Sequence, residues 1–178
     1  MKALNPRLPV RQDLALVWAG CVFVIHLWSF VNLFEALPAW VLHMNIYELA
    51  GVIGYVLVFA LLESLVVWGV LVLLAAMLPA GWLRTHFLAQ GIGLMLVASL
   101  FSALVHYNYA WLIQHINLAP IWLAVFLALA VGVWYLAGRF TGIERMLRAI
   151  LQRIEILSWI YIVFDLLGLV VIIVRNIL

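Results

Sequence analysis

The stretch IYELAGVIGYVLVFALLESLVVWGVLVLLAAML, residues 46–78, decides the fold of this chain. Between Gly51 and Leu78, Glu63 is the only acidic or basic side chain. At a rise of about 1.5 Å per residue, an apolar helix of this length crosses a hydrocarbon core of about 30 Å. Two crossings with a turn need roughly 40 residues or more. The stretch therefore predicts one membrane helix that carries a carboxyl group near mid-depth.

The composition of the whole chain also indicates a membrane protein. Of the 178 residues, 70% are hydrophobic and 9% are charged, and the mean hydropathy is +1.27. The interior of a soluble domain is too small for so many apolar side chains. The nine basic residues are spread along the chain, which is typical of orientation signals and contacts with the lipid bilayer. We therefore do not expect nucleic acid as a partner.

Four further apolar segments predict an all-α integral membrane bundle, folded as a single transmembrane domain over residues 1–178. The five crossings are expected at about 14–34, 46–78, 86–107, 118–140 and 158–176. The first apolar run is too long for a cleaved signal peptide, so we expect it to be retained. Pro38 is expected to end the first crossing, and Asn45 with Glu48 predicts a capping box at the start of the second.

A separate amphipathic helix is expected over residues 142–157, before the fifth crossing. Its apolar residues recur at helical spacing, and its opposite face is polar. Thr141 and Glu144 predict a second capping box at its start. We expect this helix to lie on the cytoplasmic membrane surface, where Arg145, Arg148 and Arg153 reach lipid phosphates.

The distribution of lysine and arginine predicts the orientation of the chain. In a five-crossing arrangement the basic residues fall on one side, apart from Arg175, whereas residues 35–48 and 108–118 contain neither lysine nor arginine. The positive-inside rule then places the N-terminus in the cytoplasm and the C-terminus outside. The compact form of the chain favours a bacterial plasma membrane.

Three ionisable side chains, His26, Glu63 and Asp165, are predicted at a similar depth near the middle of their helices. An ionised side chain there costs about 2.5–3.5 kcal/mol on insertion scales, so each is expected to face protein or trapped water. One hypothesis is a polar cavity in which these groups exchange protons. The alternative is a purely structural role, with one carboxyl group buried in its protonated form. Two helix faces are expected to point inward together. One contains Ser158, Tyr161, Asp165, Gly168 and Asn176, and the other contains Ser99, Ser102 and His106.

A weaker candidate site lies on the outer face, where two turns bring in Glu35, His43, His106 and His115. These residues have the chemistry of zinc ligands or of an acid–base site for a lipid headgroup. Their spacing matches no metal motif, so we expect neither a metal site nor a cofactor. Haem ligation by His26 and His106 fits poorly because their predicted depths differ. Cys21 is the only cysteine, which excludes an intramolecular disulfide.

The sequence favours a non-enzymatic membrane subunit or accessory protein, because short turns leave little room for a soluble catalytic portion. Its partner would be another membrane protein or a second copy. Small residues for close helix packing occur at Ala124, Ala128 and Gly132, and at Ala50, Gly51 and Gly54. The first alternative is a small proton-coupled transporter or channel for a small molecule or ion. The second is a lipid-headgroup enzyme that uses the outer-face residues.

Overall fold

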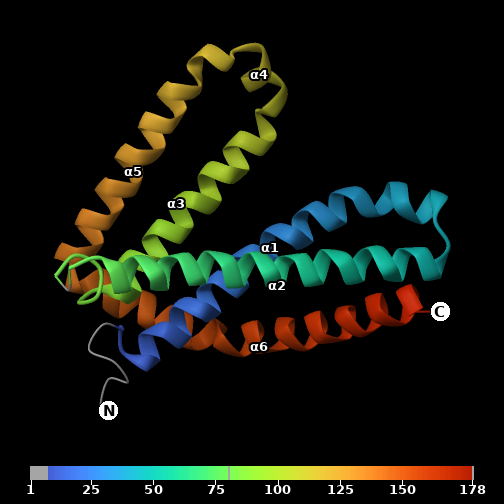
Figure 1. Ribbon diagram of the computed structural model, residues 1–178, viewed down its shortest axis with the longest axis horizontal. Helices are drawn as coiled ribbons and strands as arrows, with labels where there is room; N and C mark the ends of the chain where they lie inside the picture. The colour runs from blue at the N-terminus through green and yellow to red at the C-terminus, as the bar shows by residue number, and fades with distance from the viewer. Residues whose placement is uncertain (1–7, 80, 178) are drawn as a thin grey trace. The chain divides into compact units, whose positions relative to one another are not determined.

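The computed structural model describes residues 8–79 and 81–177, which contain helices and no strands (Figure 1). Five helices are long and apolar enough to cross a membrane. They are α1 (Arg11–His43), α2 (Ile46–Met77), α3 (Phe87–Tyr107), α5 (Ala119–Arg139) and α6 (Thr141–Ile177). A short helix, α4 (Tyr109–Gln114), and a 3₁₀ helix, η1 (Ile116–Leu118), connect α3 to α5. The predicted all-α membrane fold with five spanning helices is confirmed.

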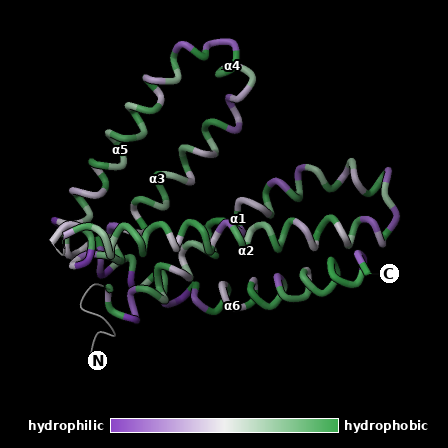
Figure 2. The backbone as a smooth tube through the Cα atoms, viewed as in Figure 1, coloured by the Kyte–Doolittle hydropathy of each residue, from purple (hydrophilic) through white to green (hydrophobic). Residues whose placement is uncertain are grey.

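Hydropathy is distributed along the helices as a bilayer requires. Figure 2 shows apolar residues along the middle of the long helices and hydrophilic residues near their ends and around α4. Much of the apolar surface is exposed, and within the most apolar part of residues 116–139 no residue is buried. Such surfaces are stable in hydrocarbon, where lipid tails take the place of a protein core.

The link between α1 and α2 is shorter than predicted, because Pro38 lies inside α1 and does not end it. Proline is tolerated within membrane helices, where neighbouring groups satisfy the freed carbonyl. The capping box at the start of α2 is confirmed. The Asn45 backbone N–H donates to Glu48 Oε2 at 3.0 Å, and the Glu48 N–H donates to Asn45 Oδ1 at 2.9 Å.

The helix expected over residues 142–157 and the fifth crossing form one continuous helix, α6. Its 37 residues extend about 56 Å, well beyond a hydrocarbon core of about 30 Å. The second predicted capping box is not formed. The Glu144 carboxylate instead contacts His86 Nδ1 at 3.1 Å and accepts a hydrogen bond from Arg148 at 3.3 Å. These partners, of which Arg148 is charged, compete with the backbone N–H for the same oxygens.

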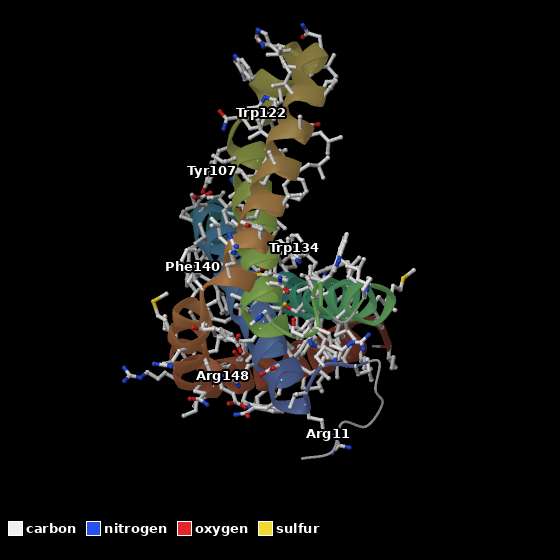
Figure 3. All side chains as sticks on the ribbon, turned by 90° about the vertical axis from the view of Figure 1, so that its left-hand side faces the viewer. Arg11, Tyr107, Trp122, Trp134, Phe140 and Arg148 are labelled. Carbon is white, nitrogen blue, oxygen red and sulfur yellow. The ribbon has the colours of Figure 1, made fainter. Side chains whose placement is uncertain are left out.

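The chain divides into two compact units, which are described separately. The first contains the described residues up to Val17 and those of Leu71–Ile150. Its main element is the α3–α5 hairpin, in which Phe101 packs against Trp122 and Phe126, with ring centroids 5.9 and 5.0 Å apart. Trp122 and Trp134 lie at different heights along this hairpin (Figure 3). The predicted packing stripe on α5 is not used here, since Ala124 and Ala128 are exposed.

A charged network lies at the end of the first unit where α3 begins. Arg148 donates from Nη2 to Asp13 Oδ1 at 2.7 Å and also reaches Glu144, which contacts His86. Tyr107 lies towards the tip of the hairpin, and Arg11 and Arg148 lie far from it (Figure 3). Asp13 and Glu144 both occupy the first turn of a helix, where the helix dipole favours negative charge.

The second unit contains Trp18–Val70 and the described residues of Leu151–Leu178. Ser158 donates to the Ala19 carbonyl at 2.8 Å, and about two turns further along both helices His26 contacts Asp165. In both contacts the two residues are 139 positions apart in the sequence. A constant offset means that α1 and α6 run parallel.

The α2 helix runs antiparallel to both partners within this unit. Trp18 packs against Trp68 near one end. Gly54 lies against Gly168 near the other, where a Cβ added to Gly168 would come within 3.1 Å of the Gly54 carbonyl oxygen. The alternating directions of α1, α2 and α6 are those of helices that cross a membrane in turn.

Candidate functional site

The most deeply buried polar contact of the second unit joins His26 on α1 to Asp165 on α6. His26 Nε2 lies 2.9 Å from Asp165 Oδ1, and both side chains are 0% exposed. The predicted inward face of the fifth crossing is confirmed in part, because Ser158, Asp165 and Gly168 are buried whereas Asn176 is exposed. Ionisable groups inside membrane helices are expensive and commonly mark functional sites. This pair is therefore the principal candidate site.

Aromatic rings from both helices hold the imidazole in place. Tyr161 precedes Asp165 by about one turn of α6, and its ring stacks on His26 with centroids 5.2 Å apart and planes 6° from parallel. Phe23 and Phe30 flank the same tyrosine ring at 6.4 and 5.5 Å. Because positions 23, 26 and 30 are spaced by three and four residues, they lie on one helix face.

The second nitrogen of His26 fixes the protonation of the ring. Nδ1 lies 2.8 Å from the Val22 carbonyl oxygen, one turn earlier in α1. A carbonyl oxygen only accepts hydrogen bonds, so Nδ1 carries a proton. The contact between Nε2 and Asp165 then needs one further proton, held by either the imidazole or the carboxyl group.

The second oxygen of the same carboxyl group has no such partner. Asp165 Oδ2 is buried, and no hydrogen-bond donor among the described residues reaches it. The nearby Ser158 hydroxyl, one turn before Tyr161, donates to the carbonyl of Ala19 and is also 3.3 Å from that of Ile154. A carboxylate with an unpaired oxygen is costly in a dry interior, whereas the carbonyl oxygen of a neutral acid is tolerated more easily.

Glu63 does not join this pair. It is exposed on α2, whereas the adjacent Ser64 is buried and donates to the Ala60 carbonyl at 2.7 Å. Glu63 therefore does not face the interior of the second unit. No hydrogen bond or ion pair links Glu63 to another described residue. Its flanking residues Phe59 and Val66 are 59% and 65% exposed, so the carboxyl group lies within an open apolar face.

The four outer-face residues are divided between the two units. Glu35 and His43 belong to α1 in the second unit, and His106 and His115 belong to the first. Glu35, His43 and His106 are exposed. Within residues 8–79 and 81–177, no group of three His, Cys, Asp or Glu side chains has an arrangement that could hold a metal ion.

The three arginines predicted to contact lipid phosphates differ in their surroundings. Arg145 and Arg153 are exposed. Arg148 is 30% exposed and is engaged with Asp13 and Glu144. The first two therefore remain available for phosphate, whereas Arg148 already has protein partners.

Comparisons with known proteins add no functional assignment. No protein-family model, curated protein or solved structure matches this chain. The site must therefore be interpreted from its own geometry.

Two polar features were not predicted from the sequence. Gln90 is buried in α3 and donates from Nε2 to the Trp134 carbonyl on α5 at 3.2 Å. The network of His86, Glu144, Arg148 and Asp13 joins residues up to 135 positions apart. The sequence contains only a weak signal for the contact between Gln90 and α5, which is the glycine at position 138. Gly138 leaves space for the Gln90 amide.

Proposed function

We propose that this chain is a non-enzymatic subunit of a membrane complex and that it binds its partner through the face of α2 around Glu63. The observation that carries this proposal is that Glu63 is exposed and has no hydrogen-bond or ion-pair partner among the described residues. On α2, Glu63 lies between Gly54 and Trp68, the positions that contact α6 and α1. It is therefore within the packed middle of the helix and too far from either end for its short side chain to reach water.

The proposed partner is another membrane protein whose helix presents a lysine, an arginine or a neutral hydrogen-bond donor at mid-depth. A carboxyl group in hydrocarbon is stabilised by a cation or a hydrogen bond. Arg153 lies furthest inside a spanning helix, but it precedes the apolar part of α6, so a second copy offers no lysine or arginine at mid-depth. Charge complementarity therefore favours a different protein over self-association.

The surrounding surface suits helix packing. Phe59, Val66 and Val70 recur with Glu63 at spacings of three and four residues and are all at least half exposed. This open face provides van der Waals contact for a partner helix, while Glu63 provides specificity. Polar contacts between membrane helices contribute about 0.6–2 kcal/mol, so the loss of Glu63 should weaken binding about 3- to 30-fold.

Photocrosslinking in native membranes tests this proposal. A photoreactive residue at Val66 is expected to capture one membrane protein, and the crosslinked peptide should contain a basic or donor side chain at mid-depth. The yield should fall about 3- to 30-fold in E63L and less in E63Q, which retains a hydrogen-bonding group. Val163, 57% exposed on α6, is the matched control position. Crosslinks to lipid alone, or to a second copy of this chain, would contradict the proposal.

We further propose that the N-terminus is cytoplasmic. The base of the α3–α5 hairpin carries Arg84, Arg139 and the Arg148 network, and residues 108–118 at its tip contain no lysine or arginine. This asymmetry supports the orientation given by the positive-inside rule. Cysteine labelling in a C21S background, at position 82 and at position 111, tests it. Position 111 should react from outside the cell, and the reverse pattern would refute the orientation.

A further inference from the structure

We infer that His26 and Asp165 form an intramembrane proton-binding site, which holds one proton between His26 Nε2 and Asp165 Oδ1. The inference is independent of the proposed partner at Glu63. It starts from the two contacts of the imidazole, at 2.8 Å to the Val22 carbonyl and at 2.9 Å to the carboxyl group. Since Nδ1 already carries a proton, removing the second proton would leave Nε2 and Oδ1 as two acceptors facing each other.

Two states of the pair contain this proton. In one, Asp165 is a neutral acid that donates to neutral His26. In the other, the proton has moved to Nε2, which gives an imidazolium and a carboxylate with the same net charge. The neutral state fits the surroundings better, because Oδ2 has no donor among the described residues and both side chains are 0% exposed. Burial of an ion pair is favourable only when its remaining hydrogen-bonding positions are satisfied.

Among the described residues of α1, α2 and α6, no other charged group contacts the pair. Tyr161 of α6 stacks on His26, and the remaining ring contact of the imidazole is with Phe30 of α1. From α2, Glu63 is exposed and points away from the buried face, where Ser64 is bonded to its own helix. No nearby carboxylate or cation therefore favours the imidazolium–carboxylate state over the neutral state. Loss of the proton would leave one uncompensated negative charge in a dry interior.

The proton count predicts how stability depends on pH. The folded pair binds one proton in either state. In an unfolded chain above about pH 6.5, aspartate and histidine bind none, because they lose their protons near pH 4 and 6.5. Unfolding then releases one proton, so the folded-to-unfolded ratio should fall about tenfold per pH unit above pH 6.5. Between about pH 4 and 6.5 the unfolded histidine also holds one proton, and this pair contributes no slope.

Comparison with D165N isolates this effect. The asparagine amide can donate to His26 Nε2, but it cannot release a proton, so above about pH 6.5 this position contributes no slope. The folded-to-unfolded ratio is measured for both proteins in mixed detergents between about pH 5 and 9, where exposed groups contribute equally. The ratio of wild type relative to D165N should fall about tenfold per pH unit above about 6.5. Parallel pH profiles would overturn the inference.

A spectroscopic measurement on the wild-type chain does not depend on the folding of any variant. Solid-state NMR with isotope-labelled histidine, assigned by comparison with H26F, should show Nδ1 protonated and Nε2 as an acceptor. Infrared spectra of the E63Q protein, in which the carboxyl group at position 63 is absent, should show a neutral carboxylic acid that disappears in E63Q/D165N. An imidazolium at His26 would overturn the assignment of the neutral state, and an ionised Asp165 beside a neutral imidazole would overturn the inference of a bound proton.

The site also sets a condition for proton transfer. Water can accept the proton from Asp165 only when α1 and α6 separate enough to wet the pair. Proton exchange would therefore report on movement between these helices. A proton-coupled transporter, the alternative considered from the sequence, requires a buried proton site of this kind.

Discussion

Replacing only one of His26 and Asp165 by an apolar residue should destabilise the protein more than replacing both. H26F keeps an aromatic ring against Tyr161 but removes both ring nitrogens, so Asp165 loses its partner. D165L removes the carboxyl group and leaves Nε2 unpaired. Each unpaired buried group costs about 1–3 kcal/mol. The double variant H26F/D165L replaces both polar groups by apolar ones, which is nearly neutral in comparable sites.

The double-mutant cycle measures this coupling directly. Each single variant should lose about 1–3 kcal/mol of unfolding free energy, and the double variant should lose less than either single variant, so the coupling energy should be at least about 1–3 kcal/mol. The measurement is reversible unfolding in mixed detergents, followed by a fluorescence probe in the second unit. Cys21, which is buried on the same helix, offers a control as C21S paired with D165L. Additive effects in the H26F/D165L cycle would refute the claim that the two side chains stabilise each other.

Three further perturbations test the packing, the capping and the charged network. G168L should destabilise the second unit by about 1–3 kcal/mol because a side chain there meets the Gly54 backbone, whereas G69L should not, since nothing lies within 4 Å of its added Cβ. The comparison is made by detergent unfolding, and equal losses would count against close packing. N45A should cost about 0.5–2 kcal/mol and speed hydrogen exchange in the first turn of α2, and unchanged exchange would exclude the capping role. R148Q should cost about 0.2–1 kcal/mol, in a salt-dependent manner, while R145Q at an exposed position should cost less. Identical salt profiles of the two variants would argue against the network.

The spanning helices could be predicted from the sequence because length and apolarity are local properties. The continuity of α6 could not. Its first half is amphipathic and its second half is mostly apolar, and this change in polarity suggested a boundary near Ser158. Backbone hydrogen bonds within a helix do not depend on side-chain polarity, so the helix continues through the change. Pro38 did not stop α1 for a different reason, because in a membrane helix neighbouring groups can satisfy the carbonyl that the missing proline N–H leaves free.

The sequence predicted the level of the candidate residues along their helices, but it did not predict which side of α2 faces its neighbours. His26 and Asp165 were expected at one level, and they meet although 139 residues separate them. Glu63 was expected to face inward, but the buried position is Ser64, and one residue corresponds to a rotation of about 100° around the helix. The α2 helix is apolar around its whole circumference, so its pattern contained no signal for the inward face. Only packing against Gly168 and Trp18 sets that rotation.

The central claim is that Glu63 occupies the middle of the membrane on a face that its own chain leaves open. A spin label at position 63, in the C21S chain reconstituted alone into lipid bilayers, tests this most directly. The label should collide frequently with oxygen, which dissolves in hydrocarbon, and rarely with a water-soluble nickel complex. A label at Ser64, which is buried, should collide rarely with either. Frequent collision with the nickel complex at position 63, or protection from both reagents, would contradict the account.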